Sequence, residues 1–147
     1  MDRYRKGPGV LAEALQGITE EELDRSHEGW TPRQVVHHVA DSEMTSAVRL
    51  RRLIAEEQPA ISGYDEELFA RRLHYSERPI ESSLGALRGA RASTAALLAL
   101  LTAAEWTRAG TPPETGAESC GAWLRAYAPP VPDHPPPLRP ARPPPPP

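Results

Sequence analysis

Two adjacent histidines, His37 and His38, lie in the run GWTPRQVVHHVADSE, which spans residues 29–43. An imidazole on a helix that faces other helices can hold a metal ion or a ligand inside a helical bundle. At about 100° per residue, His38 falls at the edge of the apolar stripe, so we predict that it is the metal ligand of the two. His37 lies about 100° further round, within reach of Asp41 four residues on, and we predict that it is a surface residue.

Glu43 falls inside the same apolar stripe. A buried carboxylate is costly unless it is paired, hydrogen-bonded or bound to a cation, so Glu43 is predicted to support the metal ligand or to act as an alternate ligand. A purely structural role for His38 stays open, because a single histidine at the edge of an apolar stripe is often a hydrogen-bonded structural residue. Cys120 has no base near it in the sequence and is not expected to be a catalytic thiol.

Helix start signals indicate how these residues are positioned. Thr31 is predicted to cap a helix whose first residue is Pro32, where the missing N–H costs nothing. Apolar residues recur with helical period from there to Glu57. Further helices are predicted over residues 9–16, 65–75, 80–103 and 121–128, with a capping box from Thr19 to Glu22 after the first. No segment alternates with period two, so we predict an all-α four-helix bundle with a truncated last helix.

Proline divides the chain into two parts. Twelve of the 18 prolines lie in the last 19 residues. Proline runs lack backbone donors and favour the extended polyproline II conformation. We therefore predict a helical domain over residues 1–128 and a Pro-rich extended tail over residues 129–147, in which the first prolines should end the last helix.

Composition restricts the partners. The 147 residues are enough for one ordinary domain, and 17 basic and 20 acidic side chains give a net charge of -3. Charges of both signs are interspersed, so binding to nucleic acid is not expected. The longest uncharged run, residues 92–104, is too short to cross about 30 Å of hydrocarbon, so no membrane span is expected. With one cysteine and no apolar signal segment after Met1, the predicted location is the cytoplasm.

The stretch over residues 29–70, and above all its HHVADS segment, resembles the DinB-like superfamily and, within it, the YfiT-like branch. The resemblance covers most of residues 20–134. It implies a four-helix bundle that holds a divalent metal, commonly zinc or nickel, with three histidines. Members include metal-dependent hydrolases and thiol transferases that use bacillithiol or mycothiol. The resemblance thus implies a small-molecule substrate and, for the transferases, a low-molecular-weight thiol, and it leaves open whether two copies pair as a homodimer.

The family's ligand pattern carries over only in part. The first ligand falls on His38, and the other two come from a segment that aligns with YAPPVPDH, residues 127–134. The final histidine of that segment falls on His134, but the middle one falls on Pro130. An H-x-x-x-H pair binds a metal because the two side chains lie one above the other on a helix, and proline removes one ligand and breaks the helix. The resemblance therefore implies an impaired metal site.

Three interpretations follow. The first is a metal-dependent enzyme of transferase or hydrolase type, in which Asp41, Ser42 and Glu43 are candidates for orienting groups or proton transfer. The second is a non-catalytic helical remnant that kept its core and lost its metal. The third is an interaction protein whose tail binds an aromatic-lined groove through the P-x-x-P segment near Arg139 and Arg142.

Overall fold

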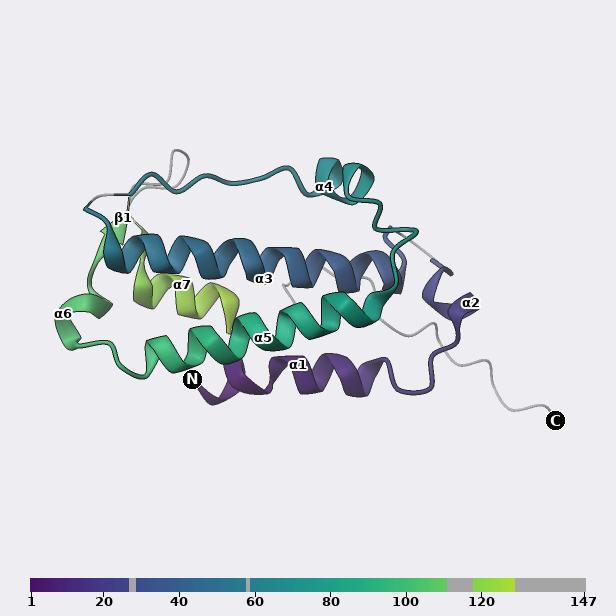
Figure 1. Cartoon of the computed structure of the whole chain (residues 1–147), viewed down its shortest axis with the longest axis horizontal. Coiled ribbons are helices and arrows are strands. Elements are labelled where there is room, and N and C mark those ends of the chain that lie inside the picture. Colours follow the sequence, from purple (N-terminus) through teal and green to yellow (C-terminus); the bar gives the residue numbers. More distant parts are fainter. Residues whose placement is uncertain (27–28, 58, 111–117, 129–147) are drawn as a thin grey trace.

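The computed structural model describes residues 1–26, 29–57, 59–110 and 118–128. Its framework consists of the long helices α1 (Asp2–Ala14), α3 (Pro32–Ala55) and α5 (Ile80–Leu98), with the shorter α7 (Cys120–Tyr127) packed against α3 (Figure 1). The other elements are the helices α2 (Glu20–Leu23), α4 (Glu66–Arg72) and α6 (Ala103–Trp106) and the two-residue strands β1 (Ala109–Gly110) and β2 (Glu118–Ser119). The described part of the chain is therefore the predicted all-α bundle.

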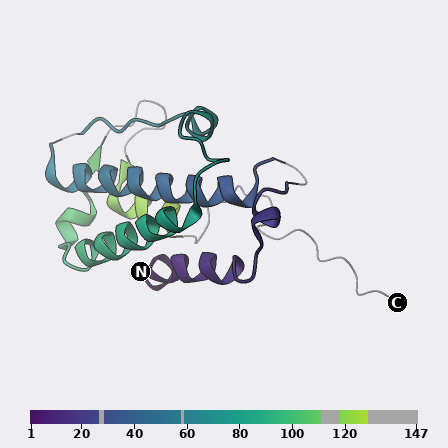
Figure 2. The ribbon, with the colours of Figure 1, turned by 45° about the vertical axis from the view of Figure 1, so that its right-hand side comes forward.

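Helix α3 is the centre of the bundle, in contact with α2, α4, α5 and α7. It begins as predicted, because the Thr31 side chain accepts a hydrogen bond from the backbone of Gln34, the Gln34 side chain bonds back to Thr31, and Pro32 opens the first turn. It ends at Ala55, where the next residue turns extended. Figure 2 shows α3 running along most of the molecule, so its faces can carry residues to several partners.

Helix α1 is longer than predicted, because it begins at Asp2 rather than near Gly9. Pro8 lies inside it and has no N–H to offer to the carbonyl of Tyr4, four residues earlier. Arg91 on α5 supplies the missing donor, with 3.0 Å between its Nη1 atom and the Tyr4 carbonyl oxygen. A tertiary contact that sequence periodicity does not reveal therefore supports the helix at its proline.

The apolar core forms two clusters along the long helices. One cluster lies at the N-terminal half of α3 and contains Leu11, Leu15, Leu23, Val35, Val36, Val39, Ala40, Ile80 and Leu87. The other lies at its C-terminal half and contains Tyr4, Leu50, Leu53, Ile61, Ala95, Leu98, Cys120 and Trp123. Between these clusters in sequence, α3 and α5 carry the buried polar residues Glu43, Ser46, Arg91 and Thr94. Buried polar groups need partners, so these four residues require polar contacts inside the bundle.

The second half of the chain departs from prediction at its connections. The helix predicted over residues 80–103 ends at Leu98, and a separate short helix, α6, follows. The helix predicted over residues 65–75 is shorter, and the chain turns at His74, which has a φ of 54°. The strands β1 and β2 pair antiparallel and are too short to show a period in the sequence.

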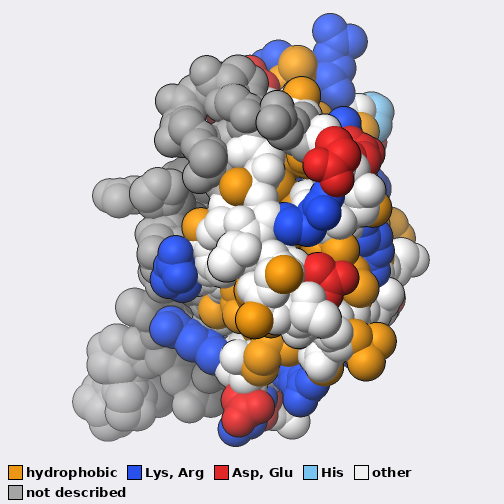
Figure 3. Space-filling view, turned by 90° about the vertical axis from the view of Figure 1, so that its left-hand side faces the viewer, with side chains coloured by type: hydrophobic (Ala, Val, Ile, Leu, Met, Phe, Trp, Pro, Cys, Tyr) orange, Lys and Arg blue, Asp and Glu red, His pale blue; other side chains and the backbone are white. Residues whose placement is uncertain are grey.

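The last predicted helix, over residues 121–128, is present as α7. Residues 129–147 lie outside the described residues, so the domain boundary at residue 128 stays a prediction. The face shown in Figure 3 carries charges of both signs among apolar side chains. Within the ranges that the structure describes, no helix has the length and apolar character needed to cross a membrane.

Candidate functional site

His38 lies in the first half of α3, on the wall of a pocket of about 270 Å³. The pocket is also lined by Val39, Ser42, Glu43, Glu66, Arg91, Ala126 and Tyr127. Only 7% of His38 is exposed, and its Nδ1 atom has no hydrogen-bond partner. A buried ring nitrogen without a partner is costly to the fold, and it is a donor that a metal ion or a polar ligand can use.

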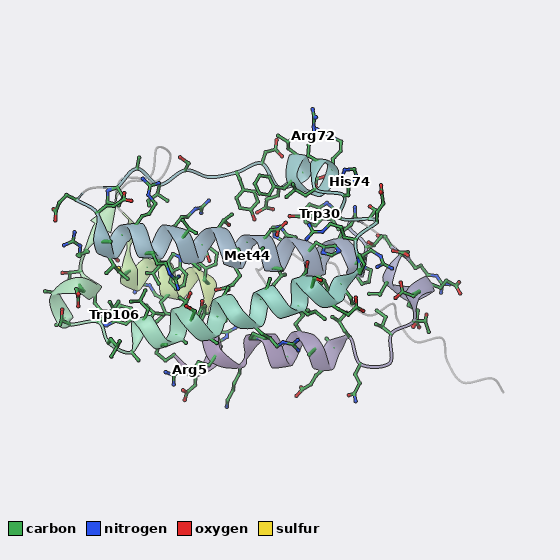
Figure 4. All side chains as sticks on the ribbon, in the orientation of Figure 1. Arg5, Trp30, Met44, Arg72, His74 and Trp106 are labelled. Atoms are coloured by element: carbon green, nitrogen blue, oxygen red, sulfur yellow. The ribbon has the colours of Figure 1, made fainter. Side chains whose placement is uncertain are left out.

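Trp30, just before α3, and Glu66, the first residue of α4, both lie against the same imidazole. Trp30 lies between α3 and α4 (Figure 4) and packs edge-on against His38, with 5.0 Å between ring centroids. The indole Nε1 of Trp30 donates to Oε1 of Glu67 at 2.8 Å. The adjacent Glu66 places its Oε1 atom 4.0 Å from Nε2 of His38. Helix α4 therefore brings a carboxylate to the histidine.

Burial lowers the pKa of His38 below its ordinary value, against the opposing influence of the nearby carboxylates of Glu66 and Asp41. The imidazole is therefore neutral near pH 7 and keeps a lone pair on one ring nitrogen. That is the form in which histidine binds a divalent cation.

His37 is fully buried, which corrects the prediction that it is a surface residue. Its Nε2 atom lies 3.0 Å from the carbonyl oxygen of Arg78, and its Nδ1 atom lies 2.8 Å from the hydroxyl of Ser83 on α5. Because a carbonyl only accepts, Nε2 carries the hydrogen and Nδ1 accepts from Ser83. The buried face of α3 is wider than its apolar stripe, because polar groups on and beside α5 cover this flank.

Asp41 and Ser42 differ in their relation to the pocket, because only Ser42 is among its lining residues. The carboxylate of Asp41 accepts a hydrogen bond from the Tyr75 hydroxyl at 2.7 Å and lies 3.8 Å from the guanidinium of Arg78. Burial raises the pKa of Tyr75, and the hydrogen bond to Asp41 raises it further. Ser42 lines the pocket with His38. Of the two, Ser42 is therefore the residue with a hydroxyl on the pocket wall.

Glu43 also lines the pocket, but its carboxylate is already engaged. It is 2% exposed, accepts from the Tyr4 hydroxyl, and lies 2.7 Å from Nε of Arg91. Arg91 also donates to the carbonyl oxygens of Tyr4 at 3.0 Å and Tyr127 at 3.1 Å. We call these residues the Arg91 cluster: Tyr4, Glu43, Arg91 and Tyr127. The cluster joins α1, α3, α5 and α7.

The described residues fit a divalent metal only in part. His134, the second predicted ligand, and Pro130 lie outside the described residues. In the ranges that the structure describes, no group of three or more His, Cys, Asp or Glu side chains is arranged to hold a metal. His38 and Glu66 offer one nitrogen and one oxygen, fewer than the three protein ligands of an ordinary catalytic zinc site.

Sequence patterns missed the partners of these residues. Glu66 belongs to the run DEEL, which is typical of the solvated first turn of a helix. Arg91 lies among small residues of α5, and nothing local indicates that its side chain is buried. One signal was available at Glu43, because a carboxylate inside an apolar stripe requires a buried cation or donor on a neighbouring element.

Curated proteins with related sequences carry names that agree with this arrangement. A protein of Oceanobacillus iheyensis named "Putative metal-dependent hydrolase" is 37% identical over 123 residues, which cover 82% of this chain and 71% of that protein. A protein of Bacillus mycoides with the same description is 36% identical over 123 residues, which cover 82% of this chain and 70% of that protein.

The fold and the family are shown by two further matches. YfiT from Bacillus subtilis, described as "a probable metal-dependent hydrolase with an unusual four-helix bundle topology", aligns with a TM-score of 0.81 and 32% sequence identity. That alignment covers 86% of this chain and 74% of YfiT. The sequence profile of the DinB superfamily matches residues 3–129. The predicted fold and family are confirmed, and this chain belongs to the DinB superfamily.

Proposed function

We propose that this chain is a metal-dependent protein of hydrolase type whose metal site is impaired. The observation that carries the proposal is the buried imidazole of His38, whose Nδ1 atom has no partner and which lines a pocket of about 270 Å³. The fold bears the cost of this nitrogen, and a bound ligand would offset that cost. The names of the relatives support a divalent cation as the ligand.

The impairment is proposed from the sequence at the remaining ligand positions. By resemblance, the other two ligands fall on Pro130 and His134. Proline has no side-chain donor, so the sequence retains two of the three histidines. Two ligands do not provide the fixed coordination that a catalytic zinc site requires. We therefore expect weak binding of zinc or nickel.

A divalent metal bound at this pocket would lower the pKa of a coordinated water or thiol and so supply a nucleophile near neutral pH. The residues of the chain have narrower roles. His38 would donate one lone pair to the cation, and the Ser42 hydroxyl would orient a polar group of the substrate. We assign proton transfer to neither Asp41 nor Glu43, because both carboxylates have strong partners. The pocket volume restricts the substrate to a small molecule.

Hydrolysis ranks above thiol transfer because the related proteins carry hydrolase names, and transfer of a low-molecular-weight thiol is the second candidate. The non-catalytic remnant is the limiting case of the same proposal, in which the site is too weak to be occupied. An interaction role for the tail rests on the sequence of residues 129–147 alone.

The zinc content of the purified chain after dialysis against zinc tests the proposal. We expect the native chain to hold well below one equivalent. A variant in which residues 129–137 are replaced by AHARDHAAQ restores the missing imidazole and removes the prolines, so it should recover about one equivalent. Pro130→His alone should recover little, because Pro129 and Pro132 still oppose the helix by about 3 kcal/mol each.

His38→Ala in the rebuilt chain is the control and should abolish zinc binding. Stoichiometric zinc in the native chain would contradict the impairment. A rebuilt chain that keeps its helical circular dichroism but holds no zinc would remove the metal site from the proposal.

A further inference from the structure

A second pocket, of about 540 Å³, lies between α1 and α5 and has twice the volume of the pocket of about 270 Å³ at His38. The proposed function does not use it. We propose that this pocket binds a small organic carboxylate with an apolar chain, whose headgroup is held by Arg5 of α1 and Arg88 of α5. The inference goes beyond the proposed function, because it concerns a different pocket and requires no metal.

The walls of this pocket combine arginines with small side chains. Helix α1 contributes Arg5, Pro8 and Gly9. Helix α5 contributes Arg88, Arg91, Ala92, Ala95 and Ala96. Among the described residues that line the pocket, none carries a carboxylate, so its charge complements an anion.

Arg5 and Arg88 are the charges available to a ligand. Both residues are exposed, and neither forms an ion pair with any residue in the described ranges. Arg91 differs, because it is buried and bonded to the Glu43 carboxylate and to two backbone carbonyls. Arg91 is therefore part of the fixed wall, whereas Arg5 and Arg88 can turn toward a bound anion.

The two available arginines lie on facing parts of the two helices, which run in opposite directions (Figure 1). The bond from Arg91 to the Tyr4 carbonyl fixes which turns of α1 and α5 meet. Arg5 directly follows Tyr4, and Arg88 precedes Arg91 by three residues, so both lie within about one turn of that bond. The forked donors of a guanidinium match a carboxylate, so one headgroup can accept from both side chains.

The small side chains provide room for an apolar chain beside the headgroup. Ala92 and Ala96 follow Arg88 at intervals of four residues, and Gly9 follows Arg5 at the same interval, so each arginine begins a row of small residues on its helix. A Cβ atom added at Gly9 would meet nothing within 4 Å, so the wall is open there. Burial of an apolar chain along these rows favours an amphipathic carboxylate over an inorganic anion.

Calorimetric titration of the full chain with octanoate tests the inference. Two further probes separate the parts of the ligand, because 1-octanol has the chain without the charge and acetate has the charge without the chain. We expect saturable binding of octanoate, at least about fivefold tighter than binding of either probe, because only octanoate uses both the arginines and the small residues.

Paired variants test the two arginines. Arg5→Gln combined with Arg88→Gln should weaken octanoate affinity by at least about fivefold, because both charge-assisted bonds are lost. The matched control, Arg71→Gln combined with Arg72→Gln, removes the same charge from α4. Arg72 lies on the opposite side of the bundle from Arg5 (Figure 4), so the control should stay within about twofold of the native chain.

Two single variants test the location. Ala92→Phe places a large ring in the pocket and should weaken octanoate binding, whereas His38→Ala should bind octanoate like the native chain, because His38 does not line this pocket. Circular dichroism checks that each variant keeps its helices. A loss in His38→Ala without a loss in Ala92→Phe would assign octanoate to the other pocket and overturn the inference.

Three other results would also overturn it: no saturable binding of octanoate by the native chain, 1-octanol binding as tightly as octanoate, or equal losses in the two double variants. None of these results bears on the zinc content that tests the proposed function, so the two proposals can fail separately.

Discussion

The buried polar groups on two sides of helix α3 differ in whether they have hydrogen-bond partners. On the side packed against α5, both ring nitrogens of His37 are hydrogen-bonded, and the Glu43 carboxylate is paired with Arg91. On the side facing α4, Nδ1 of His38 is buried without a hydrogen bond.

The difference separates the groups that hold the fold from the group that is available to bind. Removing one member of a satisfied pair strands the other, so the α5 side should be sensitive to substitution. An unsatisfied nitrogen contributes no hydrogen bond to the fold, so its removal should cost little. An unsatisfied buried nitrogen does not stabilise the fold, but it can bind a ligand. This is expected at functional sites, where a protein is often less stable than it could be.

The largest effect is expected at Arg91, on the α5 side. Arg91→Met leaves the Glu43 carboxylate buried without its cation, so the free energy of unfolding should fall by about 3–5 kcal/mol. Urea denaturation followed by circular dichroism measures it. The double variant Glu43→Gln with Arg91→Met should recover part of the loss, because no buried charge remains. A loss below about 1 kcal/mol in the single variant would contradict a structural role for the pair.

The adjacent histidines provide a matched test of the comparison. His37→Leu removes one hydrogen bond from the Ser83 hydroxyl and one from the Arg78 carbonyl, which keep contacts to Arg78 and Arg33. Because two hydrogen bonds are lost, we expect the free energy of unfolding to fall by about 1–3 kcal/mol. The same urea denaturation measures it. A variant as stable as the native chain would show that these hydrogen bonds do not hold α5 to α3.

Alkaline pH should lower the free energy of unfolding, because Tyr4 hydrogen-bonds Glu43 on the α5 side of α3. Burial raises the pKa of Tyr4, and the neighbouring Glu43 carboxylate raises it further. The folded chain therefore keeps a proton that the unfolded chain loses above its ordinary pKa of about 10. Stability is fully present below that pH and falls above it, by up to about 1.4 kcal/mol per pH unit for this group.

Tyr4→Phe should lose less stability than the native chain between about pH 9 and pH 11, because it has no such proton to hold. Urea denaturation at a series of pH values gives the two slopes. Parallel slopes would show that Tyr4 contributes nothing to the alkaline loss.

The smallest effect on stability is expected at His38. His38→Leu removes an unsatisfied nitrogen from a buried position, so without metal the free energy of unfolding should change by less than about 0.5 kcal/mol or increase. Denaturation in the presence of a chelator measures it beside His37→Leu. A loss as large as that of His37→Leu would indicate an unrecognised structural partner and remove the contrast between the two sides.

The sequence was sufficient for the framework of the fold, because the framework depends on local signals. Thr31, Pro32 and the apolar repeat that follows act within a few residues of one another, and the capping box at Thr19 is present as predicted. The extension of α1 could not be predicted, because it depends on a donor from Arg91, more than eighty residues along the chain. From the neighbouring sequence alone, Pro8 indicates a helix break, because local rules do not take a contact from a distant residue into account.

The candidate site was predictable to the extent that it lies on one helix. The position of His38 at the edge of the stripe agrees with its burial at the pocket wall. The prediction for His37 was wrong because an apolar stripe counts only apolar neighbours, and this histidine is covered by polar groups. Glu66 was missed because its distance to His38 is set by the path of the chain between α3 and α4, which no periodicity records.

Arg91 has a consequence for how this sequence can evolve. Its guanidinium bonds the Tyr4 carbonyl that Pro8 cannot serve and the Tyr127 carbonyl at the end of α7, so one side chain completes two helices. These bonds tie α1 and α7, the first and the last described helices, to α5, so selection for a folded chain acts on Arg91 through both helices. A change of Arg91 in the course of evolution therefore needs compensation at two helices at once.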